Sequence, residues 1–516
     1  MIKASVMEIL LSIMRIRSGE PCYLTQVPGF WLLTDDSFPA SFACPIFASK
    51  QLSMKLPQEF LESLEGVAGF DKEAFIAVHE EAKAPTSIRI NPAKWSVKEL
   101  PGQDSHSPLS IYHSSVPWCA NGWYLSQRPS FTFDPLFHAG CYYVQEASSM
   151  FLEQPFKQVV DLSQPLKVLD LCAAPGGKST HIQSLLSADS LLVSNEVIKT
   201  RSIVLTDNII RWGCRNVMVT NNDPRAFQKI PGYFDVMVVD APCSGSGLFR
   251  KDEEAVQEWS LNNVELCSQR QQRILADALP ALKEDGILVY STCSYSEAED
   301  EAIMDWLVQE MELENIPLSI DGMNGIVVST SSVTAATGYR FYPDKLKGEG
   351  LFLACFRKRS SSETLRLKPA KTEAVTAKER KIIGEWINAE ELEFVRYRDA
   401  IIALPPTLLP EFLLLQPHLN IQYAGTRVGE VLKEKLVPHH ALAQSLILDA
   451  SVPATELSYD EAIRYLQRQD LSIEPAITGW QVVRHQNHNL GWINALKNRI
   501  NNYYPKEIRI LKAQNN

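Results

Sequence analysis

The chain has 516 residues, a formal net charge of −11, 45% hydrophobic residues and 22% charged residues. This length is too great for one hydrophobic core, so we expect several domains of a soluble globular protein. No apolar run is long enough to span a bilayer, which argues against a membrane partner. The ten cysteines form no C-x-x-C pair, and no histidine cluster has metal-ligand spacing. We therefore expect a cytoplasmic chain with free thiols and no metal site. We also expect it to be a monomer.

Two regions precede the main pattern of the chain. Residues 1–53 show no sustained helical or strand periodicity, and Met54 resembles a natural start. We therefore predict an atypical extension that is dispensable and need not be native. After it, helical patterns, a strand-like run at 86–92 and dense aromatic residues predict a small α+β domain over 54–150. We expect this N-terminal domain to contact RNA.

Strands alternate with helices over 151–359, which we take as the main domain. Helical segments, notably 199–212 and 262–282, separate apolar runs. This alternation predicts an α/β fold with a parallel, doubly wound, Rossmann-like sheet, whose ligands bind at the carboxyl ends of the strands. A later pair of runs, 339–342 and 351–357, is expected to add an antiparallel edge. The predicted parallel strands are 168–171, 191–195, 217–220, 234–239 and 286–291.

The C-terminal part of the chain changes composition three times. Residues 360–380 have a linker composition, 381–444 form an apolar-rich intermediate domain, and 445–516 form a final unit with short strand-like runs. Between 481 and 516, six Lys or Arg residues accompany one acidic residue, a local positive excess on an acidic chain. Aromatic residues interleave with these cations, which predicts an RNA-binding unit. The aromatic residues are Trp492, Tyr503 and Tyr504.

The predicted strand at 168–171 ends in a tight turn that precedes a helix. Glycines in the turn let the backbone approach a ligand, and the start of the helix offers unpaired N–H groups. The turn lacks both the dinucleotide fingerprint and the Walker arrangement, so NAD and ATP are not expected. It consists of Cys172, Ala173, Ala174, Pro175, Gly176, Gly177 and Lys178.

Each predicted parallel strand ends near a polar residue. Glu196 lies 26 positions after Asp170, about where nucleotide-binding sheets place an acid on ribose hydroxyls. Asp223, after the third strand, is placed to meet an adenine edge. Together with the turn, these residues predict a site for an adenosine-bearing cofactor that lacks the phosphates a P-loop requires. The complete set is Asp170, Glu196, Asp223, Asp240 and Cys293.

Two strand ends carry cysteine, Cys243 after the fourth strand and Cys293 after the fifth. Two thiols at one pocket indicate nucleophilic chemistry, and a pyrimidine is a substrate that requires it. Carbon 5 of cytosine becomes nucleophilic once a thiolate adds to carbon 6, and it can then take a methyl group from a sulfonium. Asp240, touching N3 or the exocyclic amine, would stabilise the charge that develops. This chemistry alone does not choose which thiol adds.

Three motifs carry a resemblance to a known family. They are Asp-Leu-Cys-Ala-Ala-Pro-Gly-Gly-Lys at 170–178, Asp-Ala-Pro-Cys-Ser-Gly-Ser-Gly at 240–247 and Tyr-Ser-Thr-Cys-Ser at 290–294. They resemble the NOL/NOP/Sun (Sun/Fmu) family of RNA 5-methylcytosine methyltransferases. The segment Phe-Arg-Lys-Asp at 249–252 and the long tail resemble the RsmF branch, which methylates small-subunit ribosomal RNA and ends in a PUA-like RNA-binding unit.

The resemblance implies a methyltransferase sheet dependent on S-adenosyl-L-methionine, with small-subunit ribosomal RNA or the subunit itself as partner. It implies that Cys293 is the nucleophile and that Cys243 assists release of the methylated RNA, whereas Cys172 has a structural role in the turn. The implied catalytic set is Cys293, Cys243, Asp240 and Lys178. The implied cofactor-binding set is Cys172, Ala173, Ala174, Pro175, Gly176, Gly177, Lys178, Glu196, Asp223 and Asp240.

One departure and three alternatives stand beside this interpretation. Ser246 occupies a position where much of the RsmF branch has Glu, which bears on the RNA target more than on the chemistry. The same chemistry on transfer RNA fits the basic tail equally well. A non-catalytic RNA-binding factor in ribosome assembly would be expected to lack Cys293, Cys243 or Asp240, and all three are present. A small-molecule methyltransferase needs neither two thiols nor a basic tail.

Overall fold

The computed structural model describes residues 23–27, 30–34, 56–81, 84–95, 112–361, 367–388, 391–474 and 477–512. They belong to two compact units, 1–54 and 55–516. In the first unit an antiparallel hairpin joins β1 (Tyr23–Val27) to β2 (Phe30–Thr34), which sequence periodicity did not predict. The other residues of the predicted extension, 1–53, lie outside the described ranges, and its dispensability stays a prediction.

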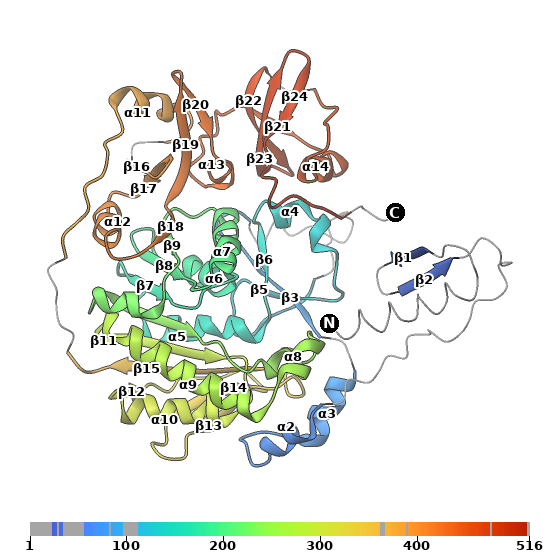
Figure 1. The fold of residues 1–516 in the computed structure, drawn as a ribbon, viewed down its shortest axis with the longest axis vertical. Helices are drawn as coiled ribbons and strands as arrows, with labels where there is room; N and C mark the ends of the chain where they lie inside the picture. The colour runs from blue at the N-terminus through green and yellow to red at the C-terminus, as the bar shows by residue number, and fades with distance from the viewer. Residues whose placement is uncertain are drawn as a thin grey trace. The chain divides into compact units, whose positions relative to one another are not determined.

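The second unit begins with two short helices and a four-stranded antiparallel sheet (Figure 1). The side chain of Asp71 accepts a hydrogen bond from the N–H of Ala74 at 3.1 Å and so caps the second helix, which buries Phe75. The strand order is β4-β5-β3-β6, and the predicted α+β character of this region is confirmed. The elements are α2 (Gln58–Ser63), α3 (Lys72–Glu80), β3 (Thr86–Ile90), β4 (Tyr112–Ser115), β5 (Gly122–Leu125) and β6 (Tyr142–Val144).

A ten-stranded mixed sheet forms the centre of this unit, in the order β13-β14-β15-β11-β10-β7-β8-β9-β18, with β12 also paired to β15. The five strands from β11 to β9 are parallel, and β12 to β15 form an antiparallel edge. The predicted doubly wound fold with its antiparallel edge is therefore confirmed. The bounds are β7 (Lys167–Asp170), β8 (Leu191–Asn195), β9 (Val217–Thr220), β10 (Phe234–Asp240), β11 (Leu282–Thr292), β12 (Leu313–Asn315), β13 (Val327–Thr330), β14 (Thr337–Phe341) and β15 (Leu351–Lys358).

Helices cover both faces of the central sheet. Successive residues of a strand point to opposite faces, so Leu169 packs in one hydrophobic cluster with Leu275 of α9 and Ile303 of α10, whereas Val168 packs in the other with Ile182 of α6. Helix α7 covers the same residues that the sequence predicted as helical. The helices are α5 (Glu153–Val159), α6 (Gly177–Leu185), α7 (Lys199–Trp212), α8 (Glu253–Glu258), α9 (Leu261–Ala278) and α10 (Glu301–Gln309).

A strand from the C-terminal half completes the far edge of this sheet. β18 (Ile421–Ala424) pairs antiparallel with β9, and Tyr423 lies opposite Val219. Sequence periodicity did not predict this pairing, because it joins segments that are far apart along the chain. β18 lies within the predicted intermediate domain, 381–444, so that region shares packing with the central sheet.

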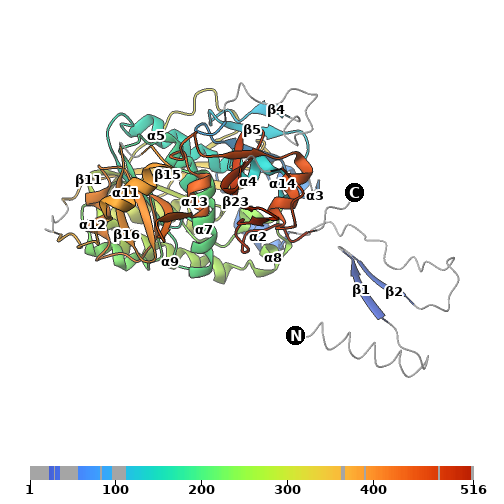
Figure 2. The ribbon, with the colours of Figure 1, turned by 90° about the horizontal axis from the view of Figure 1, so that it is seen from above.

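Two further four-stranded sheets follow, in the orders β16-β17-β19-β20 and β21-β22-β23-β24. The last sheet shares a hydrophobic cluster with the N-terminal sheet, in which Ile88 packs with Ile493. Figures 1 and 2 show α4 (Pro135–His138) beside α14 and β23. Within the described ranges, no helix combines the length and the apolar character needed to cross a membrane. The elements are α11 (Ala377–Gly384), β16 (Glu393–Tyr397), β17 (Ala400–Leu404), α12 (Leu409–Leu415), β19 (Thr426–Leu432), β20 (Lys435–Pro438), α13 (His440–Gln444), β21 (Ala454–Glu456), α14 (Tyr459–Leu466), β22 (Gly479–His485), β23 (His488–Leu496) and β24 (Arg499–Asn502).

Candidate active site

The turn after β7 is held in place by side chains of helix α7. Gly176 leads into α6 with φ at 117°, a left-handed conformation that favours glycine. Arg201 donates to the carbonyl oxygen of Ala174 at 2.9 Å, and Asn208 donates to that of Pro175 at 2.7 Å. Burial raises the pKa of the Cys172 thiol, so this side chain stays protonated. Two side chains of α7 therefore hold the turn in place, and no side chain caps the start of α6.

Asp170, at the end of β7, is a buried carboxylate with one unused acceptor. Its Oδ2 accepts a hydrogen bond from the hydroxyl of Ser179 at 2.6 Å. Its Oδ1 has no hydrogen-bond partner among the residues that the structure describes. Burial raises the pKa of Asp170 to about 7. A buried acceptor of this kind fits a ligand with a cationic or N–H group at the strand end.

Glu196 and Asp223 follow β8 and β9 and differ in burial. Glu196 is 3% exposed, and its carboxylate accepts a hydrogen bond from the N–H of Ile198 at 2.9 Å and lies 3.5 Å from the guanidinium of Arg201. Asp223 is exposed and caps the 3₁₀ helix Pro224–Lys229. Because Arg201 also holds the turn after β7, it links Glu196 to that turn, a role that sequence analysis missed.

Asn195 is a second residue that sequence analysis did not single out. Its side-chain amide donates to the carbonyl oxygens of Leu171 and Asn222, at 3.1 and 3.0 Å. Its Oδ1 accepts hydrogen bonds from the hydroxyl of Thr220 at 2.9 Å and from the N–H of Asn222 at 3.0 Å. The carboxyl ends of β7, β8 and β9 are thereby tied together.

The two candidate nucleophiles meet at the ends of adjacent parallel strands. Cys243 follows β10 and Cys293 follows β11, and Asp240 lies opposite Ser291 in the strand register. The two sulfur atoms are 3.0 Å apart, both side chains are partly exposed, and both thiols are free. The hydrogen bond with Cys293, followed by burial, raises the pKa of Cys243. One thiol therefore stays protonated when the other ionises.

Lys178 and Asp240 form an ion pair near the thiols. The Nζ of Lys178 is 2.9 Å from Oδ2 of Asp240, and the hydroxyl of Ser291 donates to Oδ1 at 2.8 Å. Burial disfavours the charge of Lys178, but Asp240 outweighs this effect and the pKa of Lys178 is raised, so the side chain is cationic. The structure thus brings Lys178, Asp240, Cys243 and Cys293 together, and their roles in catalysis stay predictions.

A buried glutamate that sequence analysis missed ties the two cysteine loops together. Glu299 is fully buried in the 3₁₀ turn Glu297–Glu299 that follows β11. Its carboxylate accepts hydrogen bonds from the N–H and the hydroxyl of Ser244, at 2.8 and 2.5 Å, and from the hydroxyl of Ser294 at 2.6 Å. Ser244 and Ser294 directly follow the two cysteines, so one carboxylate fixes both loops. Burial raises the pKa of Glu299.

Backbone contacts reinforce this link between the loops. The N–H of Gly247 donates to the carbonyl oxygen of Cys293 at 2.7 Å, and a Cβ at Gly247 would lie 2.2 Å from that oxygen. No larger residue fits this position without displacing the cysteine loop. Ser246, the position that departs from much of the RsmF branch, is buried, and its hydroxyl accepts a hydrogen bond from the N–H of Tyr295 at 3.0 Å.

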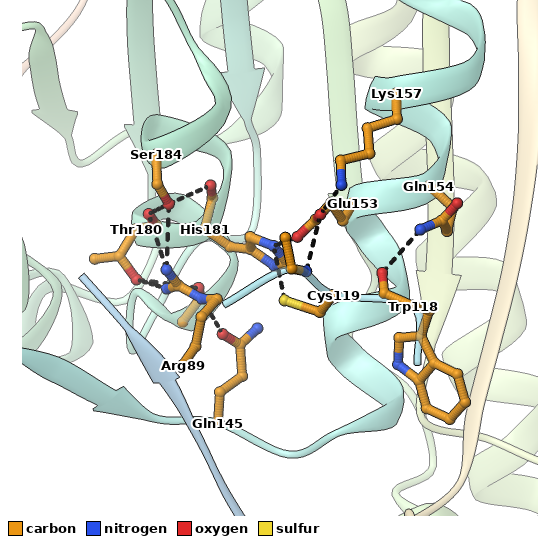
Figure 3. Close-up of polar contacts among 12 residues, drawn as sticks. Arg89, Trp118, Cys119, Gln145, Glu153, Gln154, Lys157, Thr180, His181 and Ser184 are labelled. Carbon is orange, nitrogen blue, oxygen red and sulfur yellow. Dashed lines mark hydrogen bonds and ion pairs between the residues drawn. The ribbon is translucent and has the colours of Figure 1, made fainter. Parts of the chain in front are cut away.

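Figure 3 shows a separate buried cluster that fastens α5 to α6. Glu153 forms an ion pair with Lys157, accepts a hydrogen bond from the N–H of Ala120 at 3.2 Å, and lies 3.1 Å from Nε2 of His181. The potential ligand atoms of Cys119, Glu153 and His181 lie within 4.8 Å of one another. Burial lowers the pKa of His181 to about 4, so its ring is neutral near pH 7. The carboxylate is already engaged by protein groups, and we assign the cluster a structural role.

The basic C-terminal tail separates into a core and a surface. Trp492 and Tyr504 are each 1% exposed, and the indole N–H of Trp492 donates to the carbonyl oxygen of His439 at 2.9 Å. Tyr503 is 44% exposed, and its ring centroid is 4.4 Å from that of Trp480. The prediction of RNA-binding aromatics is therefore wrong for Trp492 and Tyr504, because this small sheet uses its large side chains to fill its core.

Three family models match the chain. Residues 158–357 match the model of the 16S rRNA methyltransferase RsmB/F, 56–147 match the N-terminal domain of the 16S rRNA methyltransferase RsmF, and 452–510 match the methyltransferase RsmF PUA domain. These matches confirm the predicted combination of a methyltransferase sheet with an N-terminal domain and a C-terminal PUA-like unit.

Relatives of similar length support the same assignment. The ribosomal RNA small subunit methyltransferase F of Aeromonas salmonicida is 32% identical over 482 residues, which cover 88% of this chain and 97% of the relative. The protein of the same name from Vibrio parahaemolyticus is 30% identical over 481 residues, with coverage of 88% and 97%. The crystal structure of PH0851 covers 59% of this chain and 66% of its own, with 26% identity and a TM-score of 0.51. As its motifs predicted, the chain belongs to the RsmB/F family of 16S rRNA methyltransferases, within the RsmF branch.

Proposed function

We propose that the chain transfers a methyl group from S-adenosyl-L-methionine to carbon 5 of a cytosine in small-subunit ribosomal RNA. The observation that carries this proposal is the 3.0 Å separation of the sulfur atoms of Cys243 and Cys293, near the ion pair of Lys178 and Asp240. Methylation at carbon 5 requires covalent activation of the ring, for which a thiol is suited. Methylation of a ribose hydroxyl or a ring nitrogen requires no such thiol pair.

The ends of β7, β8 and β9 fit S-adenosyl-L-methionine. Asp170 offers an unused buried acceptor to an ammonium group, and Glu196 and Asp223 follow the next two strands, where they would face the ribose and the adenine. The turn 172–178 and the start of α6 would hold the methionine part together with Asp240. Bound there, the cofactor would supply the methyl group as an electrophilic sulfonium.

Cys293 and Cys243 divide the covalent steps in this proposal. The thiolate of Cys293 adds to carbon 6, which makes the electron pair of the 5,6 double bond available at carbon 5. After carbon 5 has gained the methyl group, its proton leaves, the double bond re-forms and the bond between sulfur and carbon 6 breaks. Once Cys293 is bound to carbon, its charge no longer opposes ionisation of Cys243. Cys243 then releases its own proton to solvent and, as a thiolate, accepts the proton that leaves carbon 5.

Asp240 and Lys178 stabilise the ring while it is bound to sulfur. Asp240 would accept a hydrogen bond from the exocyclic amine, and the cationic Lys178 would offset the negative charge that the thiolate brings to the ring. Ser291 donates to the other oxygen of Asp240 and so limits its rotation. These residues thus combine positioning with electrostatic stabilisation.

Small-subunit ribosomal RNA is the favoured target because the relatives bear that name. The same chemistry on transfer RNA would use the same site residues. A non-catalytic role in ribosome assembly is less well supported, since such a role does not require Cys243, Cys293, Asp240 and Lys178 to converge.

Bisulfite sequencing of total RNA from a strain that lacks the gene tests this proposal. We expect one cytosine of small-subunit ribosomal RNA to lose its resistance to bisulfite, and the wild-type gene to restore it. A gene encoding Cys293→Ala should not restore it. Loss of resistance in a transfer RNA would correct the target, and unchanged resistance at every cytosine would overturn the proposed chemistry.

A further inference from the structure

A second concave surface lies on the N-terminal sheet, outside the candidate active site. A groove of about 830 Å³ is lined by residues of β3, β5 and β6 and by the segment after Ser246–Leu248. A pocket of about 340 Å³ shares Pro85, Leu125, Ser126 and Arg250 with it. Because they share these residues, we treat the two as one feature, the N-terminal groove. Its larger part lies toward the upper end of the roughly 300–1,000 Å³ that ligand sites occupy.

Cations dominate the lining of the N-terminal groove, although the whole chain carries a net charge of −11. Arg128, Lys251 and Lys347 line it and are exposed to solvent. Arg250 also lines it, but its side chain is only 4% exposed, and its guanidinium lies 3.5 Å from the carboxylate of Glu349. Arg250 therefore forms part of the wall, and the other three present their charge to a ligand.

The carboxylate in the lining, Glu146, is engaged by the protein backbone. Its two oxygens accept hydrogen bonds from the N–H groups of Ser148, Ser149 and Glu349, at 2.9, 3.0 and 2.9 Å. These N–H dipoles offset its negative charge. Burial raises the pKa of Glu349 to about 7, so this neighbour is only partly ionised near neutral pH. The groove as a whole is therefore suited to a polyanion.

Both walls of the groove are tied to the candidate active site. On one wall Arg89 donates to Gln145 at 2.7 Å and to Thr180 of α6 at 2.6 Å, as Figure 3 shows. α6 is the helix that begins in the predicted cofactor turn. On the other wall, Arg250 and Lys251 closely follow Gly247 in the sequence, and the N–H of Gly247 donates to the carbonyl oxygen of Cys293 at 2.7 Å. Hydrogen bonds therefore connect the groove walls to the helix of the cofactor turn and to the loop of Cys293.

We propose that the N-terminal groove binds the sugar–phosphate backbone of the substrate RNA next to the target cytosine. This inference rests on the proposed function, which makes RNA the polyanion at this site. Lys and Arg side chains that neutralise phosphates release counterions, and such contacts position the strand without reading its sequence. The target cytosine must leave its stack to reach the thiols, and backbone contacts in the groove would help to hold the strand while it does so.

A charge-removal variant of the full chain tests this assignment, with a fluorescently labelled fragment of small-subunit ribosomal RNA as the probe. The groove variant combines Arg128→Ala, Lys251→Ala and Lys347→Ala. The control variant combines Lys371→Ala, Lys381→Ala and Lys435→Ala, which remove equal charge from exposed lysines that line neither part of the groove. Fluorescence anisotropy over a range of salt concentrations gives the RNA affinity and its salt dependence, and calorimetry gives the affinity for S-adenosyl-L-methionine.

We expect the groove variant to lose at least about tenfold in RNA affinity at low salt. Its plot of log affinity against log salt should become shallower by about 2 to 3, since each lost phosphate contact removes roughly 0.7 to 0.9 from the slope. The control variant should keep the wild-type slope, and neither variant should change cofactor affinity. A variant that combines Arg128→Lys, Lys251→Arg and Lys347→Arg should also keep the slope, because it retains the charge.

Four results would overturn the groove assignment. These are an unchanged slope in the groove variant, an equal loss in the control variant, loss of the slope in the charge-retaining variant, and loss of cofactor affinity in the groove variant. None of them bears on the methylation chemistry, which bisulfite sequencing of cellular RNA tests independently. Conversely, a wild-type chain that binds the RNA through the groove but modifies no cytosine would contradict the proposed function alone.

Discussion

The cofactor side and the thiol side of the candidate active site are built in different ways. On the cofactor side, at the ends of β7 to β9, Asp170 keeps an unused acceptor, and Arg201, which links Glu196 to the turn, is 52% exposed. On the thiol side, at the ends of β10 and β11, the buried Glu299 bonds to both cysteine loops. A side that admits and releases a small ligand needs polar atoms that have no partner within the protein. A side that holds two sulfur atoms together uses its polar atoms internally, so single substitutions should be more damaging there.

The largest expected effect is on the two cysteines, which should fail differently. Cys293→Ala removes the first covalent step, so methylation should fall to background and no RNA adduct should form. Cys243→Ala should still add to the ring and methylate it, then stall with RNA attached, because elimination lacks its base. A denaturing gel should therefore show a slowly migrating protein–RNA band for Cys243→Ala only. A band for Cys293→Ala instead would mean that the two roles are reversed.

Glu299 offers the sharpest test of the thiol side. Glu299→Gln replaces one of the two carboxylate oxygens by an NH2 group, which donates hydrogen bonds and does not accept them. The side chain then cannot accept all the bonds from Ser244 and Ser294. We expect kcat to fall by about 10²-fold, since a misplacement of roughly 1 Å can cost that much. Affinities for cofactor and RNA should stay near wild type, as measured by calorimetry and anisotropy.

Glu297→Gln is the matched control for this experiment, because Glu297 lies in the same 3₁₀ turn and is exposed. It should retain wild-type kcat. In the Cys243→Ala background, adding Glu299→Gln should slow the appearance of the covalent band. The band intensity is normalised to cofactor binding, so a loss of folded protein alone would leave this rate unchanged. Normal band formation would show that Glu299 does not position the thiols.

On the cofactor side, Asp170 predicts a pH dependence of binding. Burial raises the pKa of Asp170 to about 7, so the carboxylate loses its charge as the pH falls through that value. A cationic ammonium group prefers the ionised form, and cofactor affinity should therefore weaken from about pH 8 to about pH 6. Asp170→Asn should bind roughly tenfold to a hundredfold more weakly at the higher pH, as expected for a charged hydrogen bond of about 1.5–3 kcal/mol.

Isothermal titration calorimetry at several pH values measures this dependence, and Asp170→Asn should abolish it. The exposed Asp161→Asn serves as the control and should leave both the affinity and its pH profile unchanged. A pH profile that persists in Asp170→Asn would assign the titration to a different group.

The smallest expected effect is on Arg201. The Arg201 side chain is 52% exposed where it pairs with the buried Glu196. Ion pairs with such solvent access contribute about 0.2–1 kcal/mol, so Arg201→Ala should weaken cofactor binding by no more than about fivefold. Arg225→Ala is the control, because Arg225 forms a comparable ion pair with Asp277. This variant should bind the cofactor normally. A loss of 10²-fold in Arg201→Ala would mean that the cofactor side is as tightly interlocked as the thiol side.

Sequence analysis predicted the features that depend on local pattern. The strands at 191–195 and 217–220, the turn 172–178 and the placement of both cysteines at strand ends follow from periodicity and turn composition. The residues it missed act across long separations. Glu299 matters only because the fold brings Ser244 close to Ser294, and Arg201 only because α7 packs beside the turn. Aromatic composition likewise did not tell which residues of the tail face inward.

The pairing of β18 with β9 has a consequence for biosynthesis. β9 is complete at Thr220, but its partner strand begins only at Ile421, about 200 residues later. At roughly 5–20 residues per second, the nascent chain carries an open sheet edge for about 10–40 seconds after β9 leaves the ribosome. An open edge is a template for pairing with other chains. A fragment that stops before Ile421 would keep this edge open permanently, whereas the complete chain closes it with its own strand.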